Sequence, residues 1–415
     1  MDGQTTLAVV RIVVALIGAS VVAAFVARRL GIPDAIAFVV VGFLANFAFP
    51  ALPLAITPEL VLAVLLPGLV FEAAYRLHYE DLRRSYLSIT FLAIPGVILS
   101  AAIVAAVLVM TTGLRPELAF VVGAMVSATD PAAVVSTFSR LGAPRRLVAI
   151  VDAESLLNDG TGLAIFAIAV AAVAGGIGFL EGGTTFVLTI VLSTLIGVVV
   201  GAAAALAIVR LRDHQLQVSV SLLAAYGAYL LADGLHFSGV IASVLAGILL
   251  GNLGRRIGLR TSTERAMDEV WEFLAFVLTA LIFLLVGIAI GPAGVLAAFG
   301  PVVWGTVAVL VARAVVIYGF FGGALRLLRG RRAAPNIPVA WLHLMFWAGL
   351  RGAVATAAAL ALPASFPERE LLQRIAFGIV VSTLLIQGTT AGWVVRRTIG
   401  VSPATDDRHA KAAAT

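Results

Sequence analysis

The chain has 415 residues, of which 61% are hydrophobic and 12% charged, and its mean hydropathy of +1.09 is too high for a soluble protein. It contains no cysteine, which excludes disulfides, thiolate metal sites and thiol nucleophiles. Its pI is near 10.3, but the basic residues flank apolar segments, where they act as topology signals and not as a nucleic-acid surface.

Apolar runs long enough to cross a membrane recur from end to end, since a helix of about 20 residues spans the hydrocarbon core. They predict an all-α, polytopic membrane protein of about thirteen transmembrane helices, and soft boundaries leave counts of about twelve or fourteen open. The predicted spans cover residues 6–27, 33–49, 59–75, 86–111, 117–138, 148–174, 184–209, 216–233, 237–251, 268–290, 295–325, 337–362 and 371–395.

Basic residues concentrate in alternate loops. The intervening loops hold just Arg115, Arg369 and Arg374. Because positively charged loops stay on the cytoplasmic side, the pattern predicts an N-terminus outside and a C-terminus inside. We expect one transmembrane domain over residues 1–400, a short cytoplasmic tail over 401–415, and a location in a bacterial plasma (inner) membrane.

Helix-breaking or charged residues interrupt two spans, the fifth and the twelfth. These spans take the same place in two blocks of six, at residues 6–174 and 216–396, with the span at 184–209 as the connector. An odd number of spans between the blocks makes them inverted repeats. Inverted repeats with broken, crossing helices 5 and 12 are typical of secondary transporters with a binding site at the membrane midplane.

The fifth span contains Thr129-Asp130-Pro131 between apolar segments. Pro131 removes a helical N–H group and disfavours helical geometry at Asp130, so we expect the helix to open near Thr129. Open backbone exposes carbonyl oxygens, which can coordinate a cation.

The sixth span contains Glu154-Ser155-Leu156-Leu157-Asn158-Asp159-Gly160. Asp159 lies about ten residues past the start of the span, which puts it near the middle of the hydrocarbon core. A carboxylate there costs roughly 2.5 to 3.5 kcal/mol and indicates an ion or proton pathway; the alternative, a paired packing residue, is disfavoured by that cost. Ser155 shares the helical face of Asp159, and Glu154 and Asn158 share the neighbouring face.

Two arginines fall inside later spans. Gly349 and Gly352 flank Arg351 in the twelfth span, where they can let the helix break. A buried arginine needs a counter-charge, and we predict that Arg351 pairs with Glu154. We expect Arg313 to brace a carboxylate or the carbonyls of a broken helix.

Glu72 follows the Pro67-Gly68 break within the third span. It either lines the cytoplasmic approach or reaches the cation site. The alternative is an interfacial acid that pairs with Arg76 at the i+4 position.

Four stretches in this order resemble the monovalent cation/proton antiporters of the sodium/proton exchanger branch, the NhaP/NHE type. They are Leu66 to Tyr75, Ala128-Thr129-Asp130-Pro131, Glu154 to Gly160 and Gly349-Leu350-Arg351-Gly352-Ala353. The resemblance implies a homodimer in membrane lipid, with Asp159 as the ion and proton carrier. It implies that the cation is surrounded by Asp159, Asp130, Thr129, Ser155 and Glu72. Of these, the resemblance implies that Na⁺ is held at Asp159, Asp130, Ser155 and Thr129. It also implies that the site is organised by Asn158, Glu154, Arg351 and Arg313.

The expected function is therefore exchange of Na⁺, or of Li⁺ or K⁺, for H⁺. We predict a one-for-one, electroneutral cycle of alternating access in which cation and proton compete for Asp159, because Asn158 supplies no second carboxylate beside it. No enzyme motif and no cofactor is expected, since the chain lacks a P-loop, a dinucleotide fingerprint and a nucleophile elbow. The alternatives are a cation channel, which would pass current, or a K⁺-selective antiporter.

Overall fold

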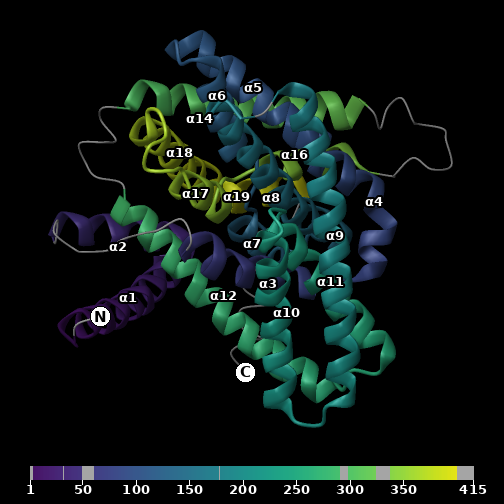
Figure 1. Cartoon of the computed structure of the whole chain (residues 1–415). Coiled ribbons are helices and arrows are strands. Elements are labelled where there is room, and N and C mark those ends of the chain that lie inside the picture. The colour runs from purple at the N-terminus through teal and green to yellow at the C-terminus, as the bar shows by residue number, and fades with distance from the viewer. Residues whose placement is uncertain are drawn as a thin grey trace.

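A computed structural model describes residues 3–30, 32–48, 60–176, 178–289, 298–323 and 337–399. All regular structure in these ranges is helical (Figure 1), which confirms the all-α prediction. In chain order the helices are α1 (Gly3–Leu30), α2 (Asp34–Ala48), the π-helical η1 (Leu60–Leu65), α3 (Leu66–Arg76), α4 (Tyr79–Ala93), α5 (Pro95–Thr112), α6 (Pro116–Met125), α7 (Ala132–Arg140), α8 (Arg145–Val173), α9 (Phe179–Arg210), α10 (His214–Gly234), α11 (Gly239–Ile257), α12 (Thr261–Ala289), α14 (Phe299–Ala314), η2 (Val315–Phe321), α16 (Val339–Trp347), α17 (Ala353–Leu360), α18 (Arg369–Thr383), η3 (Leu384–Gly388) and α19 (Thr389–Ile399).

Helices of the described residues lie in each of the predicted spans. By length and hydropathy, eight helical segments in this part of the chain can cross a membrane, whereas α2 and α6 are apolar but shorter. The chain is thus a polytopic integral membrane protein, whereas the count of thirteen spans, the inverted repeats and the orientation of the termini stay predictions. The expected tail at 401–415 lies outside the described residues.

Both predicted helix breaks are present. The fifth span consists of α6 and α7, which the non-helical segment 126–131 separates. The twelfth consists of α16 and α17, which are separated by residues 348–352. Proline at position 131 and glycines at 349 and 352 occupy the break points, as their poor fit to a helix interior requires.

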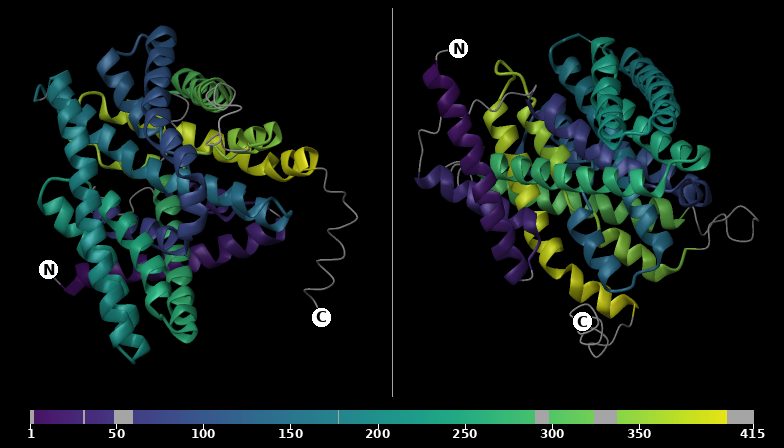
Figure 2. Two further views of the ribbon diagram at one scale, coloured as in Figure 1. Left: turned by 90° about the vertical axis from the view of Figure 1, so that its right-hand side faces the viewer. Right: turned by 90° about the horizontal axis from the view of Figure 1, so that it is seen from below.

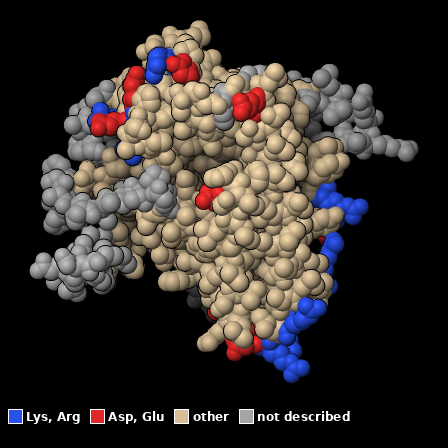
Figure 3. Space-filling view, in the orientation of Figure 1, with Lys and Arg blue, Asp and Glu red and all other residues tan. Residues whose placement is uncertain are grey.

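The sixth span, α8, lies inside the molecule and contacts α4, α6, α11 and α17. Figure 2 shows the N-terminal helices α1 and α2 on one side of the bundle and the C-terminal α19 extending on another. Much of the face in Figure 3 is uncharged, with Lys and Arg along the lower right edge and also at the upper left beside acidic residues. Of the eight candidate spans, α9 is the least buried, which fits a helix whose apolar side faces lipid.

Candidate functional site

The two broken helices meet at Asp130. Its backbone N–H donates to the carbonyl oxygen of Leu350 at 2.8 Å, which joins the two non-helical segments directly. Its carboxylate accepts from the backbone N–H of Ala353 at 3.1 Å and from that of Ala132 at 3.3 Å. These are the first residues of α17 and α7, so a single carboxylate caps two half-helices, where a negative charge is favoured.

Close packing at this crossing requires glycine at position 352. A Cβ atom added there would lie 2.0 Å from Asp130 Oδ2, which is far inside contact distance. We expect Gly352→Ala to displace the Asp130 carboxylate, to lower the free energy of unfolding by about 1–3 kcal/mol and to impair transport. Thermal unfolding of the purified protein measures the first effect.

Gly227→Ala is the matched control, because the nearest atom to its added Cβ is Leu223 Cδ1 at 3.9 Å. Alanine is the better helix former, so this variant should be as stable as the parent or more stable. Equal losses in both variants would contradict a specific role for Gly352.

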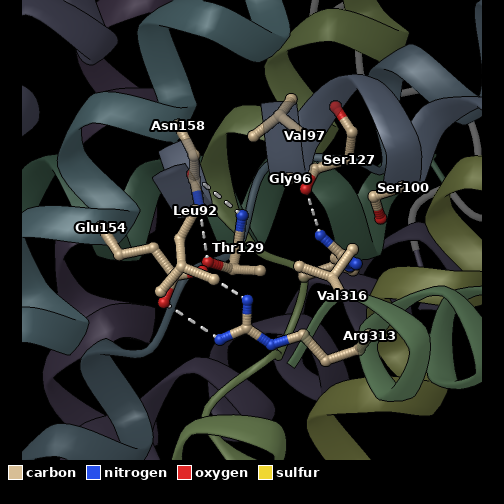
Figure 4. Close-up of a pocket in the computed structure, with 11 residues that line it drawn as sticks. Leu92, Gly96, Val97, Ser100, Ser127, Thr129, Glu154, Asn158, Arg313 and Val316 are labelled. Atoms are coloured by element: carbon tan, nitrogen blue, oxygen red, sulfur yellow. Dashed lines mark hydrogen bonds and ion pairs between the residues drawn. The ribbon is translucent and has the colours of Figure 1, made fainter. Parts of the chain in front are cut away.

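Side chains of α8 satisfy the backbone that the fifth span leaves open. Ser155 Oγ donates to the carbonyl oxygen of Thr129 at 2.6 Å. Asn158 accepts from the Thr129 N–H at 3.1 Å and donates from Nδ2 to Thr129 Oγ1 at 2.8 Å (Figure 4). Ser155 and Asn158 thus replace helical hydrogen bonds that Thr129 has lost, and they hold it against α8.

Asp159, the next residue on α8, differs from its charged neighbours. It is partly buried, its charge interacts with that of Asp130, and its carboxylate has no hydrogen bond or ion pair with any described residue. Oxygen donors of the kind that Na⁺ prefers lie nearby on Asp130, Thr129 and Ser155. The described residues contain no group of three or more His, Cys, Asp and Glu side chains that could hold a metal ion, so a cation here would depend on these mixed oxygen ligands.

The predicted pair of Arg351 with Glu154 is wrong, because Arg313 occupies that place. Arg313 forms a two-pronged ion pair with Glu154, in which Nη1 contacts Oε1 and Nη2 contacts Oε2 at 3.2 Å (Figure 4). Both side chains are at least 95% buried. Arg313 also donates to the Met345 carbonyl oxygen at 3.2 Å from Nε and 2.8 Å from Nη2, so it braces both a carboxylate and α16.

Arg351 instead neutralises backbone dipoles. Its Nη1 donates to the carbonyl oxygens of Ser127 and Ala128, the latter at 2.8 Å, just past the C-terminus of α6, where a positive charge is favoured. Its own N–H donates to Thr383 Oγ1 at 3.2 Å. Its Nε has no hydrogen-bond partner in the described structure. Arg351 also lines a small cavity together with Ser100, Thr129 and Asn158.

Glu72 forms an ion pair with Arg76, which also reaches Glu272 at 3.5 Å. This is the i+4 pair that the sequence offered as the alternative. The pair occupies the Glu72 carboxylate in this conformation, and the charge of Glu72 also interacts with that of Asp152 on α8. Its membership of the cation site therefore stays a prediction.

Sequence reasoning missed the backbone groups that complete the site, at Leu350, Met345 and Ala353, and the hydroxyl of Thr383 on α18. Backbone partners carry no sequence signal, because every residue offers the same carbonyl and N–H groups. Thr383 carried a weak signal, because it and Ser382 form a polar pair within an apolar span.

Comparisons with known proteins agree on one family. Residues 13–397 match the family described as "Sodium/hydrogen exchanger, transmembrane". The low-affinity Na⁺/H⁺ antiporter NhaS1 of Synechocystis sp. is 34% identical over 378 residues, covering 88% of this chain and 69% of that protein. The Na⁺/H⁺ antiporter NhaP of Pseudomonas aeruginosa is 31% identical over 361 residues, covering 83% and 82%.

Solved structures show the same fold. The sodium proton antiporter MjNhaP1 of Methanocaldococcus jannaschii, at pH 8, superposes with a TM-score of 0.76 over 96% of this chain and 100% of that chain, at 18% identity.

Proposed function

The chain belongs to the sodium/hydrogen exchanger family, and on that premise we propose that it exchanges Na⁺ for H⁺ across the membrane with Asp159 as the group that binds either ion. It is a secondary transporter and not an enzyme. The family and the bacterial relatives support a place in a bacterial plasma membrane. The alternation of basic loops supports a C-terminus in the cytoplasm, and the homodimer rests on the family resemblance.

One observation carries this proposal. Asp159, unlike the charged side chains around it, has no hydrogen-bond or ion-pair partner among the described residues. Glu154 is held by Arg313, Arg351 by carbonyl oxygens and Asp130 by two backbone N–H groups. An ionised carboxylate inside a membrane protein is costly unless it is neutralised, and neither a hydrogen bond nor an ion pair neutralises Asp159 in the described residues. A proton or a monovalent cation would supply that charge.

Competition at one carboxylate produces exchange. If the site reorients across the membrane only when Asp159 is neutralised, each crossing carries one ion, either Na⁺ or H⁺, and the two fluxes are coupled without nucleotide. The crossing of the broken helices supports such reorientation, because their half-helices are linked through a few hydrogen bonds at Asp130 and not through a continuous helix.

The test uses purified protein in liposomes that contain a pH-sensitive dye. We expect a Na⁺ gradient to drive protons in the direction opposite to Na⁺ at zero membrane voltage. Na⁺ entry should raise the internal pH, Na⁺ exit should lower it, and the change should saturate with Na⁺ concentration. Lithium and potassium chloride, added in turn, measure selectivity. A current that persists without any proton flux would indicate a channel and contradict the proposal.

The stoichiometry gives a separate prediction. Asp130 serves as a cap for α7 and α17, and Asn158 is neutral. We therefore propose that Asp159 alone among these three residues exchanges its ion. The cycle should then move no net charge. The Na⁺ and H⁺ gradients at which net flux stops should then be the same with valinomycin and potassium clamping the voltage at zero or at about −100 mV. One net charge per cycle would add about 2.3 kcal/mol per 100 mV and shift the equilibrium ion ratio about fiftyfold. A shift of that size would point to Asp130 or Glu72 as a second carrier.

A further inference from the structure

A groove lies between η2, α16 and α19, and it shares no lining residue with the small cavity beside Arg351. Its volume is about 570 Å³, within the range of ligand-binding pockets. Figure 2 shows the C-terminal end of α19 at the margin of the molecule, and α16 packs against α19. The groove therefore reaches the end of a membrane-crossing helix.

Aromatic side chains form its wall. The rings of Tyr318 and Phe346 lie 5.6 Å apart and those of Phe346 and Trp347 lie 5.9 Å apart. Trp347 Nε1 donates to the Gln387 carbonyl oxygen at 3.2 Å and to Thr390 Oγ1 at 3.1 Å, which fixes the indole and satisfies its polar atom. The wall thus presents apolar ring surface in a fixed arrangement, which suits a hydrocarbon chain.

The polar end of the groove is positively charged. The Arg397 guanidinium lies over the Trp393 ring at 5.4 Å from its centroid, and it forms no ion pair with a carboxylate in the described part of the chain. No acidic residue lines the groove, and His343, hydrogen-bonded to the Tyr318 hydroxyl at 2.9 Å, stands at its edge.

We propose that this groove binds an anionic phospholipid, with the phosphate on Arg397 and the upper part of an acyl chain against Tyr318, Phe346 and Trp347. Arginine and tryptophan at a helix end are the groups that meet lipid headgroups at a membrane boundary, and an arginine there favours anionic ones. The positive-inside pattern puts this end in the cytoplasmic leaflet. Trp347 is the last residue of α16, directly before the break at 348–352, so a bound lipid would steady one half of the broken helix.

The test measures binding of brominated phosphatidylglycerol to the full chain in phosphatidylcholine nanodiscs, through quenching of tryptophan fluorescence, with thermal unfolding as a second readout. Arg397→Gln should weaken the preference for phosphatidylglycerol about fivefold, as expected for one cationic contact. Arg396→Gln is the matched control, because Arg396 is the neighbouring exposed arginine and does not line the groove. It should keep most of the preference.

Three results would overturn the proposal. Equal losses in the Arg397 and Arg396 variants would reduce the effect to general surface charge. Equal quenching by brominated phosphatidylcholine in the parent would show that the groove does not select an anionic headgroup. Stabilisation by soluble glycerol phosphate as large as that by phosphatidylglycerol would make the ligand a free phosphate compound and not a lipid.

Discussion

Asp159→Asn should abolish cation-driven proton movement and leave the protein folded. The amide has nearly the same shape as the carboxylate, and the carboxylate has no hydrogen bond or ion pair in the described structure that the substitution would break. However, an amide can neither take up and release a proton nor supply a negative charge to a cation. The measurement is the initial rate of dye response in liposomes after a Na⁺ pulse, which should fall to that of protein-free vesicles.

Asp152→Asn is the matched control. Asp152 is another partly buried acid on α8, two turns before Asp159, and it forms no hydrogen bond or ion pair with Thr129 or Asp130. This variant should retain exchange. Exchange by Asp159→Asn at a rate near that of the parent would refute the carrier assignment, and loss in both variants would show that transport needs the summed charge of α8 and not a single site.

Arg313 and Glu154 should show the largest energetic coupling in the protein. Replacing either one by an apolar residue, as in Arg313→Met or Glu154→Leu, leaves the other charge buried and unpaired, which costs about 3–5 kcal/mol. The double variant removes both charges, so it should be markedly more stable than the sum of the single losses predicts. Unfolding of the four proteins, measured under identical conditions, completes the cycle.

The same cycle with Arg351→Met in place of Arg313→Met is the control. Arg351 contacts carbonyl oxygens of Ser127 and Ala128 and not Glu154, so its coupling to Glu154 should be much smaller. Additivity within about 0.5 kcal/mol for Arg313 and Glu154 would contradict the ion pair. Coupling that is larger for Arg351 would restore the pairing that the sequence predicted.

The sequence by itself determined the class of protein and the places where its helices break. Mean hydropathy excludes a soluble fold, since that much apolar surface needs lipid, and this holds whatever the tertiary arrangement is. Pro131 and the glycines at 349 and 352 act on the local backbone, so their effect could be predicted from neighbouring residues alone. The placement of Ser155, Asn158 and Asp159 on α8 likewise follows from helix periodicity.

Only the tertiary structure decided which charge meets which. Glu154 is separated by more than 150 residues from both Arg313 and Arg351, and each arginine is long enough and buried enough to serve as its partner. The outcome depends on the tertiary positions of α8, α14 and α16, which bring Arg313 of α14 between Glu154 and the Met345 carbonyl. Arg351 lies instead at the open C-terminal end of α6, because a cation is favoured beside unpaired carbonyl oxygens. Local sequence cannot predict where in space those carbonyl oxygens will lie.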